Sequence, residues 1–183
     1  MFENIIAHYP DFPKPGIDFI DVLPFLADHE AFKAVINQID SLCTAPNATA
    51  IEARGFLFTA PLLTVSTHVR HLLPVRKRGK IPYSDGDLCR VERKKDYGSD
   101  ELFFRHSDMQ RLKAEDGCVR ISLIDDFLAT GGTALDLARA LQANSPNGMR
   151  VEIAEFVFLA ELAALDGRKA LEQIAPVHTL MQI

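Results

Sequence analysis

The stretch from Ile121 to Ala134 constrains the fold and the chemistry of this chain more than any other part of the sequence. It reads Ile-Ser-Leu-Ile-Asp-Asp-Phe-Leu-Ala-Thr-Gly-Gly-Thr-Ala. Val119 to Ile124 is apolar and rich in β-branched residues, which predicts a short buried strand. The apolar positions between Ala134 and Leu141 keep helical spacing. The stretch therefore predicts a strand, an acidic pair, a turn of small residues and a helix.

The turn from Ala129 to Thr133 is suited to binding a phosphate group. Gly131 and Gly132 let the backbone curl, so that several N–H groups point toward one anion at a helix N-terminus. Thr130 and Thr133 add hydroxyl donors. Hydrogen bonds to a charged partner contribute roughly 1.5–3 kcal/mol each, so about four or five match the ~8 kcal/mol of a micromolar ligand before ordering costs.

Asp125 and Asp126 follow the predicted strand directly, at the edge where open α/β sheets bind ligands. Two carboxylates repel a bare polyphosphate, but they accept hydrogen bonds from the hydroxyls of a ribose 5-phosphate. The missing Gly-Lys-Ser/Thr excludes a P-loop, and the missing third glycine excludes a dinucleotide fingerprint. An acidic pair also ends a strand in receiver domains, but that interpretation leaves the Gly-Gly turn unexplained.

The acidic pair followed by Ala-Thr-Gly-Gly-Thr resembles the phosphoribosyl pyrophosphate signature of type I phosphoribosyltransferases. Residues 9–27 hold four of the ten prolines, which predicts an irregular arm, and they include Asp-Phe-Pro-Lys-Pro-Gly-Ile. This segment resembles the opening of adenine phosphoribosyltransferases. The resemblance implies that residues 1–27 contribute to a hood over the base and that Phe19 stacks on the purine.

Two substitutions in this arm leave the identity of the base open. The family usually has an Arg after the stacking Phe, where this chain has Ile20. Asp18 occupies a position where an apolar residue is common. Backbone groups at these positions could still bind the purine edge, since they do not depend on the side chain. A phosphoribosyltransferase for another base is therefore an alternative.

A charged cluster, Glu52-Ala53-Arg54-Gly55-Phe56, follows a predicted strand at Ala48 to Ile51 and is a second candidate anion site. Arg54 offers a planar fork of donors, and Gly55 permits close backbone approach. The cluster resembles the family's pyrophosphate loop. That resemblance implies a cis peptide between Glu52 and Ala53 and a catalytic contact between Arg54 and the leaving group.

A basic loop runs from Arg76 to Pro82, after a predicted strand at Leu72 to Val75. It resembles the family's Val-Arg-Lys-x-Gly-Lys-x-Pro segment. The resemblance implies that Arg76, Lys77 and Lys80 contact pyrophosphate. It also implies that Arg76 reaches across a subunit interface, which predicts a homodimer.

Residues 83–98 are polar and long enough for a mobile lid. The family carries Tyr-x-x-Glu-Tyr-Gly here, with the Glu credited with protonating the purine, whereas this chain has Asp96 and a spare carboxylate at Glu92. The shorter side chain reduces reach by about 1.5 Å. A regulatory protein that binds phosphoribosyl pyrophosphate with weak or no catalysis is therefore a second alternative. Farther along, Leu162 matches the residue that forms the other face of the base slot.

Composition places the chain among cytoplasmic globular proteins. Its 183 residues fit a single domain, 48% of them are hydrophobic, and the net charge of −5 argues against a nucleic-acid surface. The three cysteines lack any Cys-x-x-Cys, which favours reduced thiols. Neither a signal peptide nor a membrane span is predicted. No histidine has metal-ligand spacing, so no protein-built metal site is predicted. The family resemblance implies Mg²⁺ carried mainly by substrate oxygens.

Strands that alternate with helices predict an α/β fold with a mainly parallel twisted sheet, flanked by helices and completed by a small hood from the N-terminal arm and the C-terminal tail. Asp28 is the predicted N-cap of a helix through Ile39, and further strands are predicted at Leu102 to Arg105 and Val151 to Leu159. The leading interpretation is a purine phosphoribosyltransferase that makes AMP and pyrophosphate from adenine and phosphoribosyl pyrophosphate.

Overall fold

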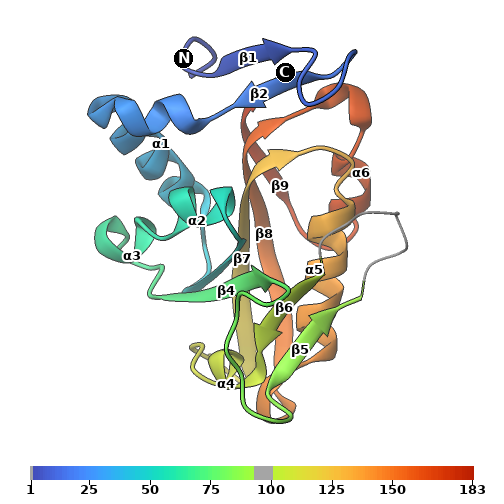
Figure 1. The fold of residues 1–183 in the computed structure, drawn as a ribbon. Helices are drawn as coiled ribbons and strands as arrows, with labels where there is room; N and C mark the ends of the chain where they lie inside the picture. The colour runs from blue at the N-terminus through green and yellow to red at the C-terminus, as the bar shows by residue number, and fades with distance from the viewer. Residues whose placement is uncertain (1, 93–100) are drawn as a thin grey trace.

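A mainly parallel sheet forms the centre of the computed structural model, which describes residues 2–92 and 101–183. Within these residues the sheet has seven strands, in the order β5-β6-β4-β3-β7-β8-β9 (Figure 1). The neighbours from β4 through β3, β7 and β8 to β9 are parallel, whereas β6 is antiparallel to both β4 and β5. The predicted α/β fold is therefore confirmed.

The strands largely coincide with the apolar runs of the sequence. They are β3 (Asn47–Ile51), β4 (His71–Lys77), β5 (Leu88–Val91), β6 (Leu102–Arg105), β7 (Cys118–Leu128), β8 (Arg150–Glu161) and β9 (Val177–Gln182). The strand expected at Val119 to Ile124 is longer than predicted, because β7 and β8 stay paired as far as Leu128 and Glu161. β5 lies inside the stretch 83–98, so part of the proposed lid is a strand.

Helices cover both faces of the sheet. They are η1 (Leu23–Ala27), α1 (His29–Leu42), α2 (Arg54–Thr59), α3 (Leu62–Val65), α4 (His106–Met109), α5 (Gly132–Ala143), η2 (Pro146–Gly148), η3 (Ala163–Leu165) and α6 (Arg168–Leu171). Figure 1 shows α1, α2 and α3 on one side of the sheet and α5 and α6 on the other. Among the described residues, no helix has the length and apolar character that crossing a membrane requires.

The core is divided by the sheet because side chains alternate along each strand. Ile121 and Leu123 of β7 belong to one buried cluster with Leu137 of α5. Ile124, on the opposite face of the same strand, belongs to a second buried cluster with Val35 of α1. β7 is thus held on both faces, which fixes the position of whatever its carboxyl end carries.

The N-terminal arm contains a hairpin, so the expectation of an irregular arm is wrong for these residues. β1 (Ala7–Pro10) and β2 (Asp18–Asp21) pair antiparallel as a separate two-stranded sheet (Figure 1). β1 is an edge strand and ends at its proline, a position where the missing N–H is tolerated. Residues of β2 share a cavity with Phe127 and Leu162, so the hairpin lies over the ends of β7 and β8.

Helix α1 begins where its cap predicts. The Asp28 carboxylate accepts a hydrogen bond of 3.0 Å from the Ala31 N–H, one of the donors that have no partner inside the helix. We predict that Asp28→Ala lowers the free energy of unfolding by about 1 kcal/mol, measured by urea denaturation. Asp85→Ala, in an exposed turn, is the control and should change it by less than about 0.5 kcal/mol. Equal losses in the two variants would contradict the capping role.

Candidate active site

The two predicted acids lie at the end of β7, inside the strand rather than after it. Asp126 is buried, with 6% of its surface exposed, and its Oδ2 lies 2.6 Å from Nε of Arg54, the first residue of α2. This ion pair is not aligned as a hydrogen bond, so among the described residues Oδ2 has no hydrogen-bond donor. Asp125 Oδ1 accepts the Asp126 N–H at 3.0 Å. Both acids line the cavity beside the turn, and Asp126 is charge-paired with Arg54 there.

Burial makes the Asp125 carboxyl costly to ionise. It raises the pKa of Asp125 well above its ordinary value of 3.8, and the neighbouring Asp126 charge raises it further. Gly55 leaves room for this carboxylate, since a Cβ there would lie 2.8 Å from Asp125 Oδ1. A ligand that hydrogen-bonds to both carboxylates would offset the lost hydration.

The predicted turn forms a cavity of about 240 Å³ beside the acids. Its lining includes all of Ala129, Thr130, Gly131, Gly132 and Thr133. Gly131 has a φ of +75°, in the left-handed region that favours glycine, and α5 begins at the next residue. The first N–H groups of a helix have no partner within the helix, so this end of α5 directs donors toward the cavity.

A second cavity of about 240 Å³ adjoins the first and is mostly apolar. Phe19 and Ile20 of β2 line it together with Leu162. Arg54 lies between aromatic rings here: its Cζ is 5.7 Å from the ring centroid of Phe19 and 5.5 Å from that of Phe127. This cavity suits a flat aromatic ligand, because aromatic walls and a few polar groups are typical of such sites.

The two cavities share a wall. Arg54, Phe127 and Ala129 line both of them. The apolar cavity and the cavity beside the acids are therefore neighbours, with these three residues at their boundary. Sequence reasoning missed Phe127, although its place between the acidic pair and the turn was a usable signal.

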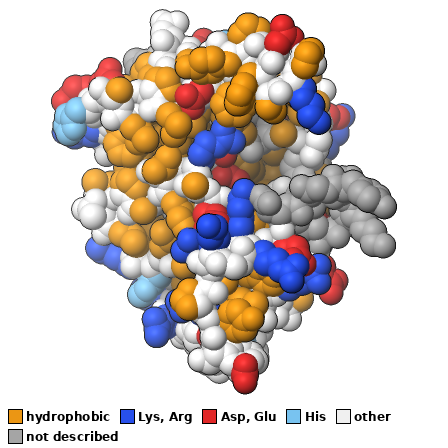
Figure 2. Space-filling view, in the orientation of Figure 1, with side chains coloured by type: hydrophobic (Ala, Val, Ile, Leu, Met, Phe, Trp, Pro, Cys, Tyr) orange, Lys and Arg blue, Asp and Glu red, His pale blue; other side chains and the backbone are white. Residues whose placement is uncertain are grey.

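The basic loop lies outside both cavities. Arg76 and Lys77 are the last two residues of β4. The Arg76 Nε donates a hydrogen bond to the carboxylate of Glu52. Lys80 is exposed. The peptide between Glu52 and Ala53 is cis, as the resemblance implied. Figure 2 shows basic and acidic side chains gathered in the middle of the face below the hairpin. Asp96 lies outside the described residues.

Magnesium has no ready-made protein cage in the part of the chain that the structure describes. No three His, Cys, Asp or Glu side chains are grouped there as metal ligands. The oxygen donors at the site are Asp125 and Asp126, and the Oδ2 of Asp126 lacks a hydrogen bond. This donor set fits an ion that keeps most of its ligands from substrate and water.

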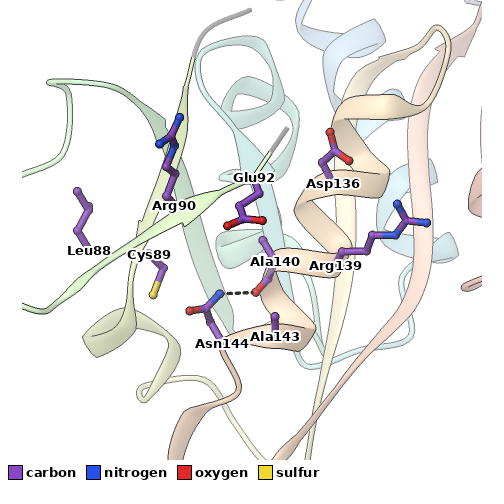
Figure 3. A pocket seen from close by; sticks show the side chains of 9 residues that line it. All are labelled: Leu88, Cys89, Arg90, Glu92, Asp136, Arg139, Ala140, Ala143 and Asn144. Carbon is purple, nitrogen blue, oxygen red and sulfur yellow. Dashed lines mark hydrogen bonds between the residues drawn. The ribbon is translucent and has the colours of Figure 1, made fainter. Parts of the chain in front are cut away.

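A larger cavity, of about 670 Å³, lies between β5 and α5 (Figure 3). Two arginines and two acids line it: Arg90, Glu92, Asp136 and Arg139. It contains none of the sequence-predicted site residues, and its opposite charges favour no single class of ligand. The adjoining pair of cavities is therefore the better candidate site.

Comparison with known proteins gives one consistent picture. The chain is 38% identical over 181 residues to an adenine phosphoribosyltransferase of Prochlorococcus marinus, covering 97% of this chain and 96% of that protein. A solved adenine phosphoribosyltransferase from Thermoanaerobacter pseudethanolicus superimposes with a TM-score of 0.79 at 33% identity, covering 100% and 98% of the two chains. No protein-family model matches the chain.

A second solved structure carries ligands. The adenine phosphoribosyltransferase of Saccharomyces cerevisiae, complexed with D-2,5-dideoxy-2,5-imino-altritol 1,6-bisphosphate and adenine, superimposes with a TM-score of 0.77. It is 28% identical to this chain and covers 98% of it, with 96% of its own length matched.

The raised pKa of Asp125 predicts a pH dependence of stability. Between 3.8 and this raised pKa the folded protein binds a proton that the unfolded chain has lost, so wild-type stability falls as pH rises through that window. Asp125→Asn removes this loss. We predict that its free energy of unfolding, relative to wild type, increases with pH above 3.8, as measured by urea denaturation across pH without ligand. Asp85→Asn is the control; a difference that stays constant with pH would contradict the prediction.

Proposed function

Since this chain belongs to the adenine phosphoribosyltransferase family, and is therefore a glycosyltransferase, we propose that its two adjoining cavities bind its two substrates. The reaction makes AMP and pyrophosphate from adenine and phosphoribosyl pyrophosphate, in purine salvage. The shared wall of Arg54, Phe127 and Ala129 is the observation that carries the assignment of the cavities. In this assignment the base and the ribose lie in neighbouring cavities, as bond formation between them requires.

The cavity beside the acids takes the ribose 5-phosphate portion. The turn from Ala129 to Thr133 holds the phosphate through backbone N–H groups and two hydroxyls. Asp125 and Asp126, which line this cavity, accept hydrogen bonds from the ribose hydroxyls. The yeast relative, which was solved with an imino sugar bisphosphate and adenine, supports a paired site of this kind.

The apolar cavity takes adenine. Phe19 and Leu162 lie against the adenine ring. The backbone N–H and C=O groups of β2 at Asp18 and Ile20 form hydrogen bonds with the edge of the base. A site that hydrogen-bonds one pattern of donors and acceptors rejects a base with another pattern, because its own polar groups would then be left unpaired. Backbone recognition accounts for adenine binding without the family's usual Arg at position 20.

Catalysis in this proposal is mainly positioning and charge stabilisation. The bond from ribose C1 to pyrophosphate breaks, and N9 of adenine takes its place on C1. Arg54 stabilises the charge that develops on the leaving pyrophosphate, with Arg76, Lys77 and Lys80 as further cations. Asp125 and Asp126 would lie beside a Mg²⁺ ion held mainly by substrate oxygens, and that ion would supply further charge neutralisation. The proton on N9 leaves as the new bond forms, and Asp96, in the proposed lid sequence 83–98, is the carboxylate that we assign to proton transfer with the base.

The assembly we propose is a cytoplasmic homodimer that contacts neither nucleic acid nor membrane. The cysteines at 43, 89 and 118 are unpaired and buried, which fits a reducing compartment. The net charge of −5 disfavours a polyanion partner. Arg76 reaches the site of the second subunit once substrate competes with Glu52 for its guanidinium.

A panel of bases assayed with phosphoribosyl pyrophosphate tests the choice of substrate. We predict a kcat/KM for adenine about 100-fold or more above that for hypoxanthine or guanine, because a 6-oxo group presents an acceptor where adenine presents a donor. AMP formation is followed by chromatography. Equal or better turnover of a 6-oxopurine would exclude adenine as the preferred base.

Mixed dimers test the proposed role of Arg76 across the interface. Subunits with Arg76→Ala keep the acids, and subunits with Asp125→Asn and Asp126→Asn keep the arginine. If Arg76 serves the partner's site, a mixed dimer contains one complete site. We predict that each variant alone loses about 100-fold or more in kcat, while the tagged and purified mixed dimer recovers roughly half of wild-type activity. Mixed dimers as inactive as the parents would show that Arg76 does not act across the interface.

A further inference from the structure

The phosphate turn rests on the backbone of a distant glycine. Gly167, at the start of α6, lies so close to the turn that an added Cβ would be 2.1 Å from the Ala129 carbonyl oxygen and 2.7 Å from Gly131 N. From the other side, a Cβ on Gly131 would lie 2.6 Å from the Gly167 carbonyl oxygen. Two backbones are therefore in direct contact where side chains usually keep them apart.

Sterics alone require glycine at position 167. Its φ of −66° and ψ of −23° are open to every residue, so the backbone conformation does not call for glycine. Real Cβ atoms essentially never approach a heavy atom within 3.0 Å, whereas here the contact would be 2.1 Å. A side chain at 167 would thus force the turn or the 162–168 segment to move by roughly 1 Å, a displacement that can cost about 100-fold in rate at a reacting site.

An ion pair closes the segment that carries Gly167. Glu161, at the end of β8, has a side chain only 5% exposed and accepts from Arg168 Nη2 at 2.7 Å. Arg168 also donates to the Val177 carbonyl at 2.6 Å and to Thr179 Oγ1 at 3.2 Å, which ties the segment to β9. The Arg168 guanidinium holds the pKa of the Glu161 carboxyl below its usual range, so the pair is charged at neutral pH.

The same segment reaches both proposed substrate cavities. Leu162, next to Glu161, lines the base cavity, and its N–H donates to the Leu128 carbonyl at 2.9 Å. Gly167, at the other end of the segment, supports the phosphate turn. Gly167 contacts Ala129, Thr130 and Gly131, of which only Ala129 also lines the base cavity, so a disturbance at Gly167 should act mainly on the phosphate turn.

We propose that Gly167 is a positioning residue for phosphoribosyl pyrophosphate: its bare backbone holds the turn from Ala129 to Thr133 in the conformation that grips the 5-phosphate, and the Glu161–Arg168 pair holds Gly167 in place. The inference rests on the proposed phosphate-binding role of that turn. It assigns to the C-terminal segment a function in sugar-phosphate binding that is distinct from the role of Leu162 at the base.

The test is Gly167→Ala, with steady-state kinetics and calorimetric binding of ribose 5-phosphate. The expected result is an increase of about tenfold or more in the KM for phosphoribosyl pyrophosphate and in the Kd for ribose 5-phosphate, with the KM for adenine within about threefold of wild type. Gly148→Ala is the matched control. Gly148 has a φ of +72° and no atom within 4 Å of an added Cβ, so this change strains the backbone without touching the turn. It should lower the melting temperature and leave both KM values unchanged.

Two more variants separate the possible failures. Thr130→Glu puts a negative charge into the phosphate cavity and should abolish ribose 5-phosphate binding; normal binding in this variant would overturn the proposed function of the turn. If Thr130→Glu abolishes binding but Gly167→Ala binds normally, only the inference about Gly167 is overturned. If Gly167→Ala does not fold, the inference is tested with Arg168→Lys, which keeps the positive charge but loses the forked guanidinium. The same selective rise in the KM for phosphoribosyl pyrophosphate supports the inference. Unchanged KM values overturn it.

Discussion

Two adjacent carboxylates at the buried end of β7 are the constraint on which the rest of the site depends. Burial raises the pKa of Asp125, so its ionised form is unfavourable in the folded protein without ligand. The surroundings only partly compensate, through the ion pair between Arg54 and Asp126. In the proposed site, the ribose hydroxyls complete the compensation and the 5-phosphate lies on the turn from Ala129 to Thr133. The end of β7 thus favours a ligand that supplies hydrogen-bond donors to the two carboxylates.

Much of the fold could be predicted from local patterns. The apolar run from Leu102 to Arg105 predicted the bounds of β6, and Asp28 as N-cap predicted the start of α1. Both features are determined by residues that are neighbours in the sequence. The continuation of β7 through its acids could not be predicted, since it depends on pairing with β8, including Phe127 opposite Ala160. The hairpin in the proline-rich arm was missed for the same reason: its strands are defined by each other.

The candidate site divides in the same way. The turn and the acids are contiguous in sequence, so their association with one strand end was predictable, and the structure brings Phe19 and Leu162 to them. The support from Gly167 was not predictable, because nothing in its local sequence indicates that another backbone will touch it. Positions where glycine is required by distant packing become visible only when the two segments are seen together.

The most direct test of this account is a crystal structure of the protein with ribose 5-phosphate. We predict that the phosphate lies over the turn from Ala129 to Thr133, within hydrogen-bond distance of its backbone N–H groups. We also expect the ribose hydroxyls to face Asp125 and Asp126. Clear density for the sugar phosphate elsewhere, for example in the cavity between β5 and α5, would contradict it.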